Sequence, residues 1–184
     1  MGVNWLKEIG LANNDDEGTA RRLESMASAL RKAANQFLPP VDDATRRKDD
    51  VAVACFMCHL TIEQGIKAVL CTFGEQPPRT IHDLKKLLSD VVGPQQELLA
   101  AALDDIALND VTLWSFAGRY MHHMEPGVEE RLTSPAFIAA LFQATLRLSL
   151  IVVEIFDGHK LERSLSEVNK AIATYEQATY VERA

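Results

Sequence analysis

The feature that most constrains this chain is a long apolar segment, residues 51–71, which is followed by a proline pair at 77–78. Its length and composition predict one helix of about six turns. Proline has no amide hydrogen to donate inside a helix, so the helix must end before the pair. A helix that is apolar on nearly all sides has to be covered by other helices. We therefore expect this segment to form the centre of a helical bundle.

Helical spacing recurs along the chain, whereas sustained apolar–polar alternation and an Asn-Gly hairpin are both missing from the sequence. Between the acidic stretch at 13–17 and Pro39, apolar residues recur at steps of three and four and predict one inward stripe. These residues are Leu23, Met26, Leu30, Ala33 and Phe37. The charged segment 42–50 is expected to be a loop or a polar helix start. The pattern as a whole predicts an all-α fold, an antiparallel bundle of six or seven helices.

Capping signals mark the expected helices after the proline pair. Thr80 and Asp83 have the spacing of a capping box and predict a helix start at residue 81. Gly93 and Pro94 separate that helix from another. The inward residues expected for the first are Leu84, Leu87, Leu88 and Val91, and those expected for the second are Leu98, Ala102, Leu103 and Ile106. Asp110 is then expected to cap a helix from 111 to about 124.

In the last third of the chain, the residues that start and end helices are easier to recognise. Proline and glycine at 126–127 end the preceding helix, and Ser134 before Pro135 predicts an N-cap with proline at the first helical position. The helix that follows, residues 136–157, is closed by Gly158. Ser164 and Glu167 have the spacing of a further capping box, which predicts a C-terminal helix over about 164–181.

Composition indicates an ordinary globular protein. The chain has 184 residues, 47% of them apolar, and a formal net charge of −7, so we expect a single domain over 1–184 that does not bind nucleic acid or membrane by bulk charge. The N-terminus has no signal-peptide pattern, which predicts a cytoplasmic protein. Residues 137–156 are apolar enough to raise the question of a membrane span. Their polar residues, Gln143, Arg147 and Glu154, fall within about 40° of one another on a helix, which favours the centre of a bundle instead.

Two motifs carry possible chemistry in the apolar segment. Cys55, Cys58 and His59 match the Cys-x-x-Cys-His pattern of haem attachment, but they lie within a helix and no second cysteine pair exists to complete a zinc site. Buried, reduced thiols are the simplest interpretation, and no metal or cofactor is expected. His59, Glu63 and Lys67 recur every four residues and share one helical face. That face is either an exposed stripe, which we favour from the segment alone, or the lining of a polar cleft.

The segment Glu63-Gln-Gly-Ile-Lys67-Ala-Val-Leu70 resembles the Glu-x-x-x-Lys helix of the HEPN family. In that family the helix is followed by a loop with proline and then by a helix that opens with His-Asp-Leu. This chain has the same order in Pro77-Pro78 and His82-Asp83-Leu84, and a later Arg119-Tyr120 pair also matches. The resemblance covers about residues 19–157, which we take as the core bundle, with the C-terminal helix added to it.

The resemblance implies a helical bundle that dimerises, and in many members a metal-independent ribonuclease that serves as a toxin or a phage-defence component. Active members carry Arg, four to six residues, and then His; here three residues separate Arg119 from His123, and two separate it from His122. The resemblance therefore implies Arg119 and His123 as the catalytic pair, with His122 as a substitute. Glu63, Lys67 and Tyr120 would support this pair or contact RNA or a nucleotide.

Two alternatives to catalysis stay open. One is a nucleotide- or RNA-binding protein without activity, and the other is a protein-interaction module in which Arg119 to His123 is a surface or dimer-interface patch. Partners implied by the resemblance are a second copy of the chain, RNA or a nucleotide, and an antitoxin protein. Phosphate-binding loops and hydrolase or zinc-protease motifs are absent from the sequence, which argues against other enzyme classes.

Overall fold

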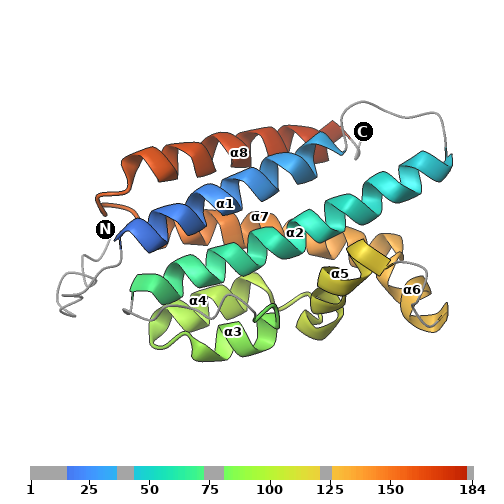
Figure 1. Cartoon of the computed structure of the whole chain (residues 1–184), viewed down its shortest axis with the longest axis horizontal. Helices are drawn as coiled ribbons and strands as arrows, with labels where there is room; N and C mark the ends of the chain where they lie inside the picture. Colours follow the sequence, from blue (N-terminus) through green and yellow to red (C-terminus); the bar gives the residue numbers. More distant parts are fainter. Residues whose placement is uncertain (1–15, 37–43, 73–80, 121–125, 182–184) are drawn as a thin grey trace.

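The structure is a computed structural model that describes residues 16–36, 44–72, 81–120 and 126–181, and these residues form helices and no strand (Figure 1). The all-α prediction is confirmed, with at least one helix more than expected. The helices are α1 (Asp16–Asn35), α2 (Ala44–Thr72), α3 (Leu84–Asp90), α4 (Pro94–Ala102), α5 (Leu108–Tyr120), α6 (Pro126–Leu132), α7 (Pro135–Ile155) and α8 (Glu162–Val181).

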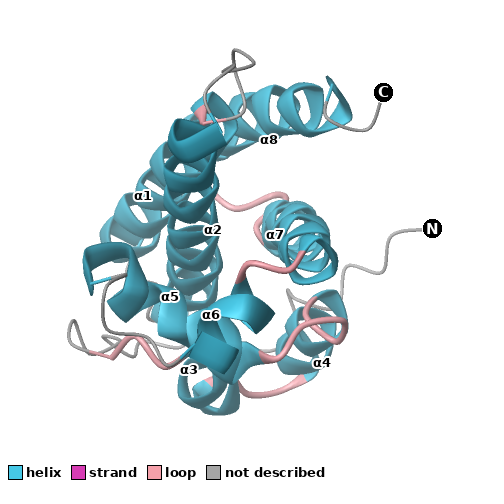
Figure 2. Ribbon diagram, turned by 90° about the vertical axis from the view of Figure 1, so that its right-hand side faces the viewer, coloured by secondary structure: helices cyan, strands magenta, loops and turns pink. Residues whose placement is uncertain are grey.

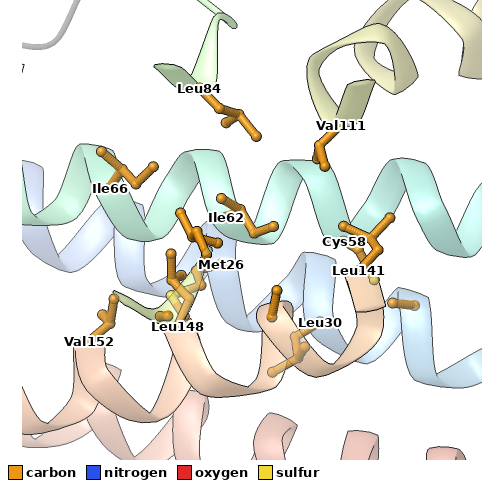
Figure 3. Close-up of a cluster of buried hydrophobic side chains, with 14 of the residues drawn as sticks. Met26, Leu30, Cys58, Ile62, Ile66, Leu84, Val111, Leu141, Leu148 and Val152 are labelled. Atoms are coloured by element: carbon orange, nitrogen blue, oxygen red, sulfur yellow. The ribbon is translucent and has the colours of Figure 1, made fainter. Parts of the chain in front are cut away.

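Helix α2 is the central element, as the apolar segment predicted. It packs against α1, α7, α5 and α3, and Figure 3 shows its residues Cys58, Ile62 and Ile66 surrounded by side chains from these neighbours. The buried apolar side chains of the eight helices form one continuous cluster. Four of the other helices pack against α2, and it therefore contributes the centre of this apolar core.

The bundle is closest at Gly65, in the second half of α2. A Cβ atom at this position would lie 2.8 Å from Leu148 Cδ2 and 3.3 Å from Val152 Cγ2, both on α7, and 3.4 Å from Met26 Sδ on α1. Because glycine has no side chain, position 65 lets α1 and α7 lie closer to α2 than they could with any other residue there.

Helix α8 is fixed to the centre by a buried tyrosine. The Tyr175 hydroxyl lies 3.3 Å from Cys58 Sγ and donates to the carbonyl of Phe142 at 3.4 Å. All three cysteines of the chain are buried, and none of them forms a disulfide. Burial raises the pKa of the Cys55 thiol, and it raises that of Cys58 to about 11 despite the hydrogen bond with Tyr175. The thiols of Cys55 and Cys58 are therefore core groups that are not ionised at neutral pH, as expected.

Several helix starts differ from the predictions. Thr80 lies outside the described residues, and Asp83 is itself the N-cap of α3: its backbone is extended and its carboxylate accepts from Lys86 N at 3.0 Å. A capping box that begins the helix at 81 is therefore wrong, since Asp83 sits outside the helix. Leu98 of α4 is also exposed, because Leu99 faces the core in its place.

Three further boundaries were placed too late or missed. Helix α5 starts at Leu108, so Asp110 lies in its first turn instead of capping it. Pro126 was expected only to end the preceding helix, but it is the first residue of the short helix α6, which was not predicted. Helix α8 starts at Glu162, with Leu165 N donating to Leu161 O, so the capping box at Ser164 is wrong. Ser134 and Gly158 act as predicted: Ser134 Oγ accepts from Phe137 N, and Gly158 has a φ of 80°.

Two described helices are long and apolar enough, by length and composition alone, to cross a membrane. The first is residues Asp50–Thr72 of α2, of which 72% of the most apolar window is buried in the bundle. The second is α7, where only 39% is buried. The prediction that α7 occupies the centre is therefore wrong: α2 does, and α7 lies at one edge of the bundle with one face outward (Figure 2).

Substituting Gly65 with valine should destabilise the fold by about 1–3 kcal/mol, because its side chain would overlap with Leu148 in a closely packed core. The measurement is urea unfolding followed by circular dichroism. Gly127→Ala in α6 is the matched control, since nothing lies within 4 Å of a Cβ there, and it should stabilise by up to about 1 kcal/mol. Equal stability of the two variants would contradict a close helix approach at Gly65.

Candidate functional site

A buried ion pair lies on the face of α2 that packs against α3. Lys67 Nζ donates to Glu63 Oε1 at 2.7 Å, and the two side chains are only 1% and 2% exposed. They stand one helical turn apart, so a regular helix brings them together. The exposed-stripe interpretation of this face is therefore wrong, because the packing of α3 and α5 onto α2 removes it from solvent.

The second carboxylate oxygen of Glu63 bonds to a histidine from the segment before α3. His82 Nδ1 donates to Glu63 Oε2 at 2.9 Å, and the His82 side chain is 46% exposed. A neutral imidazole that donates from Nδ1 keeps its lone pair on Nε2. His82 is therefore the one member of this group that is open to solvent, and Glu63 orients it.

His59 lies one turn before Glu63 and is completely buried. Its Nε2 donates to the backbone carbonyl of His82 at 3.3 Å, and its Nδ1 has no hydrogen-bond partner. Both the side chain and the backbone of His82 are thus held from α2. A buried, unpaired ring nitrogen is costly, so this position is not explained by packing alone.

The network continues to the opposite side of α2. Gln64 Nε2 donates to Glu63 Oε1 at 3.2 Å, and Arg22 Nη1 on α1 donates to Gln64 Oε1 at 3.0 Å. The Glu63 carboxylate therefore accepts from three side chains. This chain of hydrogen bonds links α1, α2 and the start of α3, and we call the group His59, Glu63, Lys67 and His82 the buried charge cluster.

The electrostatics follow from burial and pairing. Burial alone would raise the pKa of Glu63, but the hydrogen bonds from Lys67 and His82 more than offset it, so that this pKa lies below its usual value. Burial lowers the pKa of His59, although the Glu63 charge opposes the change. At neutral pH the cluster therefore contains an ionised carboxylate and a neutral His59. With both Glu63 and Lys67 shielded from solvent, they shape the fold in this conformation and do not meet a ligand directly.

A second set of contacts fixes α5 next to this cluster. Leu84 N at the start of α3 donates to Thr112 Oγ1 of α5 at 3.2 Å. Asp110 of α5 accepts two hydrogen bonds from Arg131 of α6, both at 2.8 Å, in a bidentate pair. Trp114 is buried one turn further along. Helix α5 is therefore held from α3 and from α6.

The predicted catalytic residues lie at the far end of α5. Arg119 and Tyr120 are its last two residues, and their side chains are not described. His122 and His123 lie outside the described residues. Their catalytic role stays a prediction, as do the supporting roles of Glu63 and Lys67. Sequence reasoning did not pair His82 with Glu63, although the shared family motif that contains both was a usable signal.

The architecture defines a helical bundle whose central helix carries a buried Glu-x-x-x-Lys pair, bonded to the histidine of a following His-Asp-Leu segment. A model of the HEPN domain matches residues 27–129, which is more than half of the chain. The chain therefore belongs to the HEPN family. No curated protein and no solved structure matches it.

Lys67→Met should cost about 3–5 kcal/mol of unfolding free energy, because it leaves the buried Glu63 carboxylate without its shortest partner. The double variant Glu63→Leu/Lys67→Met should recover much of that loss, since it removes both charges. Lys170→Met is the matched control: Lys170 also pairs with a glutamate, Glu167, but it is 68% exposed, and its loss should have little effect. Equal losses in both single variants, measured by urea unfolding, would contradict a buried pair.

Stability should fall as pH drops below about 6.5, the ordinary pKa of histidine. Below it the unfolded chain binds a proton at His59 that the folded chain, with its lowered pKa, does not. The stabilisation from Glu63, whose pKa is also lowered, should be lost only further down, below about pH 4.5. His59→Gln should reduce the slope of stability against pH near pH 6, by at most about 1.4 kcal/mol per pH unit. An unchanged slope in this variant would rule out His59 as the source.

Proposed function

We propose that this HEPN protein is a metal-independent endoribonuclease, in which Arg119 and His123 act as the catalytic pair and His122 is the substitute for His123. The proposal rests on family membership, on Arg119 in the last turn of α5, and on the two histidines that follow in the sequence at positions 122 and 123. We also propose that it works as a homodimer in the cytoplasm, with an antitoxin protein as a further partner.

The packing of α5 supports the proposal. A catalytic site needs its groups placed to within about 0.5 Å, which favours residues carried by rigid elements. Helix α5 is bonded to α3 through Thr112 and to α6 through Asp110, and α3 is bonded to the buried charge cluster through His82. In this way Glu63 and Lys67 would support catalysis at a distance, by holding the helix that ends in Arg119.

The reaction needs only groups that the chain supplies. The 2′-hydroxyl of RNA attacks the adjacent phosphorus as a histidine takes its proton, and the bond to the 5′-oxygen of the next nucleotide breaks. The leaving 5′-oxygen receives the proton that the histidine took up, and the other product is a 2′,3′-cyclic phosphate. Arginine stabilises the charge that develops on the phosphate oxygens, by a bidentate contact. Tyr120 is proposed to contact RNA.

The purified protein should cleave mixed RNAs in the presence of EDTA, and Arg119→Ala and His123→Ala should each reduce cleavage by about 10²-fold or more. The matched controls are Arg163→Ala on the exposed surface of α8 and His159→Ala, which should cleave like the wild type. Cleavage products are read on denaturing gels, and folding by circular dichroism. Equal cleavage by the wild type and both catalytic variants would rule out the assignment.

A HEPN protein that only binds a nucleotide would cleave no RNA but would show a higher melting temperature with ATP or NAD, because a ligand that binds the native state stabilises it. An interaction module would show neither effect. The same purified samples distinguish the three cases.

A further inference from the structure

His82 differs from the other members of the buried charge cluster because its side chain is 46% exposed. It precedes α3, which lies on the outside of the bundle (Figure 1). The ring is held at one nitrogen only: Nδ1 donates to Glu63 Oε2 at 2.9 Å, whereas Nε2 has no hydrogen-bond partner among the described residues. Because Nδ1 points at the buried carboxylate, the exposed part of the ring is the side that carries Nε2.

Two contacts from α2 hold His82 in this orientation. Its ring is bonded to Glu63, and its backbone carbonyl accepts from His59 Nε2 at 3.3 Å. The Glu63 carboxylate is itself held, because its other oxygen accepts from Lys67 Nζ at 2.7 Å and both side chains are shielded from solvent. A group that is already held in place needs little further ordering before it reacts. The contacts that position α3 therefore also preorganise an exposed imidazole.

The carboxylate of Glu63 determines which ring nitrogen of His82 can react. A neutral imidazole carries its proton on one nitrogen and its lone pair on the other, and a hydrogen bond to a carboxylate fixes this choice. With the proton on Nδ1, the lone pair is on Nε2. When Nε2 forms a bond with an electrophile, the ring becomes cationic, and the ionised Glu63 carboxylate stabilises that charge.

From this geometry we infer that His82 Nε2 is a nucleophile that accepts a phosphoryl group from a small anionic phosphoryl donor. The Nε2 lone pair forms a bond to phosphorus, and the bond between phosphorus and the leaving group of the donor breaks, with its electron pair on the leaving group. The Nδ1 proton stays between His82 and Glu63, so the step needs no separate base. His82 is thus a modification site of the chain, separate from RNA cleavage.

The exposed residues beside His82 favour an anionic donor. Lys85 and Lys86 follow it within four residues in the first turn of α3, and both are exposed. The carboxylate of Asp83 is also exposed, but it is bonded to Lys86 N as the N-cap of the helix. Two cations and one anion leave a local excess of positive charge, which attracts a phosphate group to a chain whose net charge is −7.

The probe for this reactivity is phosphoramidate, which transfers its phosphoryl group to an imidazole nitrogen and releases ammonia. At about pH 8, where an ordinary histidine is neutral, His82 in the folded protein should react about tenfold or more faster than in a free peptide of residues 76–88, the rate equivalent of one charge-assisted hydrogen bond. The product should carry phosphorus only on Nε2. Mass spectrometry locates the modified residue, and phosphorus NMR distinguishes the two ring nitrogens.

Two comparisons assign the reaction to the held imidazole. His159 is half-buried and has no carboxylate bonded to its ring among the described residues, so it should react more slowly than His82. His82→Asn is the matched variant, because its amide nitrogen takes the place of Nδ1 and can still donate to Glu63, whereas nothing replaces Nε2. This variant should keep the circular dichroism of the wild type and lose the fast modification.

Two outcomes would overturn the inference. One is modification of His82 at the rate of the free peptide or more slowly. The other is a mixture of Nδ1 and Nε2 products at His82, because a ring held by Glu63 offers only Nε2. The comparison of folded protein with peptide needs no variant to fold. RNA takes no part in these measurements, so their result is separate from that of the ribonuclease assay.

Discussion

The architecture depends on the buried carboxylate of Glu63. A charge removed from water is tolerated only when its oxygens are paired, and here the donors are Lys67 and Gln64 on the same helix and His82 from the start of α3. His82 is the donor that comes from another element. The carboxylate is fully satisfied only when that segment lies against the middle of α2, so one electrostatic requirement sets where a distant part of the chain must be.

Three consecutive residues of α2 show how one helix organises the bundle. Successive side chains on a helix point about 100° apart. Glu63 therefore bonds toward α3, Gln64 bonds to Arg22 on α1, and Gly65 makes room for Leu148 of α7. Charge, hydrogen bonding and the absence of a side chain each specify one neighbour. The directional contacts fix the register of α1 and α3 along α2, and Gly65 fixes the distance to α7.

The helix boundaries that could be predicted from the sequence are those marked by a residue at the boundary itself. Ser134 before Pro135 and Gly158 at positive φ are set by the backbone, and both were found as expected. The boundaries at Leu108 and Glu162 depend on tertiary anchors, such as the buried Leu161 ahead of α8, which periodicity does not show. The burial of Glu63 and Lys67 was missed for the same reason. A spacing of four residues brings two side chains together, but only the docking of α3 decides whether that face meets water.

A buried charge cluster is an unusual way to hold α3, because apolar residues of similar volume often stabilise a fold as well or better. Leu84 and Leu87 already bury the apolar face of α3, but apolar packing is non-directional and tolerates small sliding of one helix along another. The hydrogen bonds of His82 with Glu63 and His59 are directional and permit one register. Because Leu84 then bonds to Thr112 of α5, that register passes to the helix that ends in Arg119. The cluster therefore specifies the position of α3 and, through Leu84 and Thr112, that of the first turns of α5.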